Sequence, residues 1–194
     1  MLITQTEISK ALSKANEIDS IYVLNYLDPN RNDKSDYDLW DLTKKYTNRT
    51  IEILELNLRA NNSSIWSFCA IRPVDCEIVL LSGLNYCKKK FAMCKELFHI
   101  ILDCEDYRST NTRNTIDEYL YSGIGQATSI PTQTELLAEM AAMEFLFPYH
   151  VRLHVLSGNV NYDDIAEQYK VPKTLVERYL SEHYMKYLVN NKSD

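Results

Sequence analysis

The segment 50–58 sets the strongest limit on what this chain can fold into. TIEILELNL alternates isoleucine and leucine with glutamate and asparagine, and this period of two is typical of a half-buried β-strand. IWSFCAI and CEIVLL follow, separated by RPVD, and predict a β-hairpin. We therefore expect a small antiparallel sheet in the middle third of the chain.

Apolar residues spaced three or four positions apart predict helices on both sides of this sheet. Before it, helices are expected at 5–18 and 34–46; the run IYVLNYLD could extend the first or form a short strand. Ser35 is the expected N-cap of the second, with core contacts from Tyr37, Leu39, Trp40 and Tyr46. After the sheet, helices are expected at 91–102, 133–147, 162–169 and 173–188, with a further short turn at IDEYLY and a frayed tail at NNKSD. The fold class is therefore α+β, with one domain over 1–160 and a small helical appendage over 161–194 packed on it.

Composition narrows the function classes. The chain has 194 residues, a net charge of −6 and five cysteines without a CxxC pair, so we expect neither a disulfide framework nor a zinc ribbon. The acidic balance disfavours direct nucleic-acid binding. The N-terminus does not resemble a signal peptide and no apolar run approaches the length of a membrane helix, so we expect a cytoplasmic protein without a membrane partner.

The stretch FAMCKELFHIILD, residues 91–103, holds the candidate chemistry. In a zinc peptidase helix, two histidines four residues apart face one side, and the glutamate after the first reaches the metal-bound water. Here Glu96 and His99 stand in the second and last positions of that pattern, but Lys95 replaces the first histidine. The motif is therefore a degenerate HExxH.

Three stretches resemble the ImmA/IrrE family of metallopeptidases, in the family's order. KKKFAMCKELFHIILD is similar to its motif helix. ELLAEMAAMEFLFP, which begins at Glu135, is similar to its glutamate-led ligand helix, and DDIAEQYKVPKTLVERYL is similar to its closing helical pair. The resemblance runs from about Cys76 to Leu180 and departs from the family at Lys95 and at Phe98, which replaces the usual glycine.

The resemblance implies a zincin-like fold with a motif helix, a ligand helix, and extra N- and C-terminal helices. It also implies a partner, a helix-turn-helix repressor encoded beside the gene, often on a phage or another mobile element. Relief of repression by cleavage or displacement would make the protein a transcription regulator of the anti-repressor type. An extended peptide is expected to add to CEIVLL as a sheet-edge strand.

Lys95 decides between two interpretations of the site. An ammonium about 4 Å from a divalent ion is opposed by about 8 kcal/mol at an effective dielectric near 20. A protonated Lys95 can instead fill the metal position and pair with Glu135 or Glu96. We therefore expect no cofactor and a catalytically inactive, partner-binding pseudoenzyme, with Lys95 as the blocking residue.

The alternative is an active zinc metalloendopeptidase that cleaves the repressor. His99 and Glu135 would then be metal ligands, together with a third group that the sequence does not identify. Glu96 would be the general base on the metal-bound water.

Other patterns carry less weight. His150 and His154 have the spacing of a metal-binding pair but lack a glutamate partner. Cys94 and Cys104 flank the motif helix, and buried thiols are the simpler interpretation of both. Glu96 and His99 also form a Glu-x-x-His pair of the di-iron type, without a second copy. Residues 162–180 have the spacing of a helix-turn-helix, but their charge balance favours packing or protein docking over DNA binding.

Overall fold

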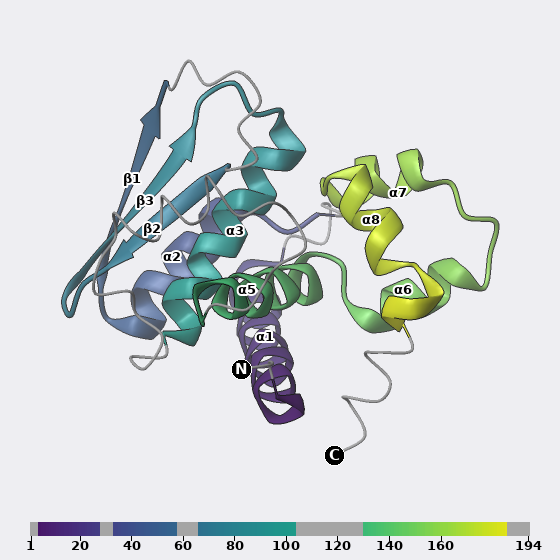
Figure 1. Cartoon of the computed structure of the whole chain (residues 1–194), viewed down its shortest axis with the longest axis horizontal. Coiled ribbons are helices and arrows are strands. Elements are labelled where there is room, and N and C mark those ends of the chain that lie inside the picture. Colours follow the sequence, from purple (N-terminus) through teal and green to yellow (C-terminus); the bar gives the residue numbers. More distant parts are fainter. Residues whose placement is uncertain (1–3, 28–32, 58–65, 104–129, 186–194) are drawn as a thin grey trace.

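The computed structural model describes residues 4–27, 33–57, 66–103 and 130–185 (Figure 1). The described residues form an α+β fold with a small three-stranded mixed sheet. The expected turn at IDEYLY, Cys104 and the tail NNKSD lie outside them. The elements are α1 (Gln5–Tyr26), α2 (Asp36–Thr47), β1 (Thr50–Leu56), β2 (Ser67–Ile71), β3 (Asp75–Leu81), α3 (Tyr86–Leu102), α5 (Ile130–Leu146), α6 (Tyr149–Leu156), α7 (Tyr162–Tyr169) and α8 (Lys173–Tyr179). None of the described helices is both long enough and apolar enough to cross a membrane.

The sheet differs from the prediction in one pairing. β2 and β3 form the expected antiparallel hairpin, but β1 pairs with β3 in parallel, and the strand order is β1-β3-β2. The fully antiparallel sheet was therefore wrong. Alternation in a sequence assigns residues to the two faces of a strand but does not determine which strand lies alongside it.

β3 is central in the sheet, which also corrects the expectation that CEIVLL is an edge strand. The apolar residues Cys76, Ile78 and Leu80 of β3 point to one face, where they are buried. Helices α2 and α3 lie on this face (Figure 1). We call it the inner face and the opposite one the outer face.

The first two helices follow the sequence signals, with corrections at their ends and surfaces. α1 continues through the run that could have formed a strand and ends at Tyr26. Ser35 caps α2 as predicted, because its Oγ accepts a hydrogen bond from the Asp38 N–H at 3.3 Å. Leu39 is fully buried. Tyr37 and Tyr46 are exposed instead of buried, and the Tyr46 hydroxyl bonds to charged side chains of α1.

The last helix is shorter than predicted, whereas α7 has its predicted bounds of 162–169. α8 ends at Tyr179 and not at residue 188, because Ser181 starts a new turn: its Oγ accepts from the Tyr184 N–H at 3.3 Å. Ile165 of α7, Val176 of α8 and Leu180, the C-cap of α8, belong to the same buried cluster as residues of α3 and α5. The appendage thus shares the core of the preceding helices.

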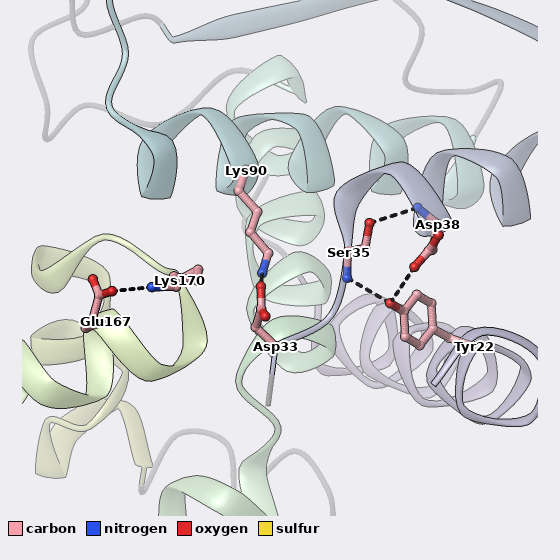
Figure 2. A network of polar contacts seen from close by, with 7 residues as sticks. All are labelled: Tyr22, Asp33, Ser35, Asp38, Lys90, Glu167 and Lys170. Atoms are coloured by element: carbon pink, nitrogen blue, oxygen red, sulfur yellow. Dashed lines mark hydrogen bonds and ion pairs between the residues drawn. The ribbon is translucent and has the colours of Figure 1, made fainter. Parts of the chain in front are cut away.

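A short connection before α2 ties several helices together (Figure 2). The fully buried Lys90 ammonium of α3 lies 2.8 Å from Oδ2 of Asp33. Two residues later, the Ser35 N–H donates to the Tyr22 hydroxyl of α1 at 2.8 Å. Both contacts fix where α2 begins relative to α1 and α3.

Lys34 supplies a third tie from the same connection. Its ammonium lies 2.6 Å from Oδ1 of Asp19 on α1, and it donates to the backbone carbonyl of Phe145 on α5. Burial lowers the pKa of Lys34, and the Asp19 carboxylate opposes that effect. Residues 33–35 therefore contact α1, α3 and α5 at one point.

Lys90→Ala should destabilise the fold by about 3 kcal/mol, the low end for a broken buried ion pair, since Asp33 stays partly hydrated. Lys45→Ala is the matched control: it removes an exposed i,i+4 pair with Asp41 and should cost about 0.5 kcal/mol or less. Urea denaturation at neutral pH measures both. Equal effects of the two substitutions would contradict the role given to the Asp33 pair.

Candidate functional site

The candidate site lies where α3, α5 and β2 meet. Lys95, Glu96 and His99 come from the middle of α3, and Glu135 comes from the N-terminal part of α5. These are the four site residues predicted from the sequence, and the structure brings all four together. Helical spacing explains why Lys95 and His99 face the same way, because four residues are close to one turn.

The centre of the site is an ammonium between two carboxylates. Nζ of Lys95 lies 2.5 Å from Oε2 of Glu135 and 3.1 Å from Oε1 of Glu96. Only 16% of the Lys95 side chain is exposed, and only 1% of the Glu96 side chain. The two acidic groups thus hold the positive charge at a fixed place in a largely dry site.

Glu135 also faces His99. Its Oε1 lies 3.1 Å from Nε2 of the imidazole, although this nitrogen is not aligned for a hydrogen bond with any described protein atom. Burial alone would raise the pKa of Glu135, but the neighbouring Lys95 and His99 side chains outweigh it and lower that pKa below its ordinary value. Glu135 is therefore held as a carboxylate.

β2 contributes two side chains that the motif analysis missed. The Ser67 hydroxyl donates to Oε1 of Glu96 at 2.6 Å. The Cys69 thiol interacts with the same carboxylate; burial, followed by the charge of Glu96, raises the pKa of Cys69 well above its ordinary value. Both residues stand at alternate positions of a predicted strand, and this alternation was the only sequence signal that they share a face.

These residues do not fit a zinc ion. Zinc needs lone-pair donors, and a protonated ammonium has none. Lys95 stands at the position of the missing first histidine, and its Nζ contacts Oε2 of Glu135, the carboxylate that a metal would require. Cys69 is another side chain near Glu96 that could bind a metal. Its raised pKa disfavours the thiolate form that binds metals.

Phe98 fills the core beside the site. Its ring is fully buried and lies 5.8 Å from the ring of Phe145 on α5. A glycine at this position would leave space between α3 and α5, so the benzyl group helps to set how these two helices pack.

The other candidate residues lie elsewhere. Cys94 is buried on another side of α3, toward Lys34 and Lys90, where burial raises its pKa. His150 and His154 are both exposed on α6. Within the described ranges, no three His, Cys, Asp or Glu side chains gather in a way that could hold a metal. The four-residue spacing of His150 and His154 therefore forms no metal site among the described residues.

Three consecutive lysines near the start of α3, Lys88, Lys89 and Lys90, contact other parts of the fold. Lys90 pairs with Asp33, Lys89 pairs with Glu55, and Lys88 lies 5.3 Å from the centre of the Trp66 ring. These contacts engage the run within the fold.

Comparisons with known proteins add no family assignment. No family model matches the chain, and no curated protein sequence matches it either.

The lowered pKa of Glu135 gives a pH-dependent prediction. A carboxylate whose pKa is lower in the folded state stabilises the fold above its unfolded pKa, near 4.5, and loses this effect as the pH falls further. Glu135→Gln should therefore destabilise the protein most at pH 7 and progressively less below about pH 4.5. Urea denaturation across this pH range measures the difference.

Glu177→Gln on the exposed face of α8 is the control and should change stability little at any of these pH values. A destabilisation by Glu135→Gln that stays constant from pH 7 to pH 3 would contradict the pairing with Lys95 and His99.

Proposed function

We propose that the protein is a zincin-like relative of the ImmA/IrrE metallopeptidases that has lost its chemistry and acts by binding a protein partner. The partner would be a helix-turn-helix repressor in the cytoplasm, and the effect would be anti-repression in a phage or mobile-element circuit. The observation that carries the proposal is the position of Lys95. Its ammonium contacts both Glu135 and Glu96.

Electrostatics supports the loss of the metal. A dication entering this site would have to displace a tethered cation or bind beside it, at a cost of several kcal/mol even at a protein-like dielectric. Deprotonating Lys95 first would cost about 1.4 kcal/mol per pKa unit. The pair with Glu135 opposes that deprotonation, because it favours the charged form of both groups.

The edge of β2 supports partner binding beside the same site. The Leu81 N–H donates to the Trp66 carbonyl and the Arg72 N–H donates to the Asp75 carbonyl, each at 2.9 Å. Alternation then directs the backbone N–H and C=O groups of Cys69 and Ile71 to the outer edge of β2, which pairs with no described strand. We call it the free edge. An extended segment of a partner could pair there as an additional strand. Pairing of this kind would compete with the partner's own contacts, and that competition requires no metal.

Lys95→His should restore zinc binding, because it supplies the missing imidazole and removes the competing cation. We expect micromolar or tighter zinc binding with one-to-one stoichiometry in this variant, and none for the unmodified protein in the same range. Isothermal titration with zinc chloride measures both. Lys95→Met is the matched control, since it removes the charge without supplying a ligand.

Two results would contradict the proposal. Stoichiometric zinc in the unmodified protein that disappears in His99→Ala would favour the active metalloendopeptidase. Failure of Lys95→His to bind zinc, with the fold intact by circular dichroism, would show that the site is not built on a zincin plan.

Partner binding predicts a metal-independent effect on repression. The repressor encoded beside the gene should be released from its operator DNA by this protein in the presence of EDTA, without cleavage. Ile71→Pro removes an N–H at the free edge of β2, a position where proline is tolerated, and should weaken release by about tenfold or more. DNA-binding anisotropy and gel analysis of the repressor provide the two readouts.

Cleavage that EDTA abolishes would identify the enzyme instead. A repressor that stays on its DNA at saturating protein would remove this partner from the proposal.

A further inference from the structure

The outer face of the sheet carries an apolar row without a described helix over it. Leu54 of β1 is aligned with Val79 of β3, and Val79 is aligned with Phe68 of β2. Beside this row, Leu56 is aligned with Leu81. Leu54 and Leu56 are 42% and 40% exposed, whereas Val79 at the centre of the row is 3% exposed. The described helices that contact the sheet lie on its inner face (Figure 1).

The sequence of β3 indicates that this face is normally covered. β3 reads DCEIVLL, and its apolar residues point to both faces, with Val79 outward between the inward Ile78 and Leu80. All-parallel sheets are covered on both faces, and their strands have near-continuous apolar runs. β3 has such a run, although it is parallel only to β1 in this mixed sheet. The helices of the described residues supply one of these two layers.

The apolar row borders an acidic pair. Glu52 of β1 is aligned with Glu77 of β3 on the same face, and like charges directly opposite each other destabilise a sheet. Arg72 compensates partly: it lies 3.6 Å from Glu77 and 3.3 Å from Asp75. Among the described residues, no cation forms an ion pair with Glu52. A cation from outside would relieve this repulsion.

We propose that the outer face is a docking surface for a basic amphipathic helix of a partner protein. The partner's apolar stripe would cover Leu54, Leu56 and Phe68, and its lysine or arginine side chains would lie over Glu52 and Glu77. This surface is distinct from the β2 edge, and the inference does not depend on the proposed anti-repressor function.

Charge complementarity selects this occupant over a second copy of the chain. A symmetric dimer through the outer face would bring the same patch of both copies together and bury the Glu52 and Glu77 carboxylates near their own equivalents. Helices are one of the two kinds of layer that cover the face of a sheet in known architectures. The apolar stripe of such a helix would match the row across the three strands.

A defined probe tests the surface in the full chain. The probe is a fluorescent peptide of about 18 residues made of leucine and lysine, with leucines at i, i+3, i+4 and i+7. We expect saturable binding by anisotropy that weakens with added salt. The double variant Leu54→Asp, Leu56→Asp should bind about tenfold more weakly or worse, and Glu52→Lys should reduce both affinity and salt dependence. Leu24→Asp on α1, where the leucine is 84% exposed, is the matched control and should bind normally.

Three other outcomes would overturn the proposal. Equal binding of a scrambled peptide with the same composition, or binding unaffected by the Leu54 and Leu56 substitutions, would show nonspecific attraction to an acidic protein. A dimer in sedimentation velocity that Leu54→Asp dissolves would assign the face to a second copy. Absence of binding in a protein whose Leu54 and Leu56 exclude solvent, measured by side-chain footprinting, would show that the chain covers the face itself.

Discussion

The ion pair between Lys95 and Glu135 joins the two helices on which the candidate site is built. Lys95 comes from the middle of α3, Glu135 from the first part of α5, and their charged atoms lie 2.5 Å apart. Glu96 and Ser67 extend the contact to β2. In a metallopeptidase of the resembled family, a metal ion joins these elements. Here the Lys95–Glu135 ion pair joins α3 and α5, and under the proposed function it takes the place of that metal.

A buried ammonium with two carboxylates satisfies its charge and links α3 to α5. In the proposed function this link replaces a metal that would offer an open coordination position and activate water. The proposed function then depends on the surface around the site, above all on the edge of β2 that pairs with no described strand. Contacts of Asp33, Lys34 and Ser35 connect α1, α2, α3 and α5. These contacts fix the relative positions of the helices that carry the site residues.

Much of this arrangement could be predicted from the sequence, because periodicity reports local structure well. Most of the helices, the hairpin and the cap at Ser35 follow from spacing and side-chain chemistry. α6 was not predicted, because Pro148 indicated only the end of the preceding helix. The helical spacing of Lys95 and His99 also placed both on one face.

The pairing of β1 with β3 could not be predicted in this way, since strand order depends on contacts distant in sequence. For the same reason Cys69 was missed: only packing of β2 against α3 brings its thiol to Glu96. The end of α8 was missed because the Ser181 hydroxyl accepts a hydrogen bond from the Tyr184 backbone N–H, which a continuous helix would use itself. The helical spacing of apolar residues on both sides of Ser181 gave no sign of this break.

The central claim, that Lys95 has replaced the metal, is tested most directly by anomalous diffraction. Crystals of the unmodified protein grown with excess zinc should show no anomalous peak between His99 and Glu135, and density should place Nζ of Lys95 against the Glu135 carboxylate. An anomalous peak about 2.0 to 2.2 Å from both His99 and Glu135, with Lys95 turned away, would contradict the account.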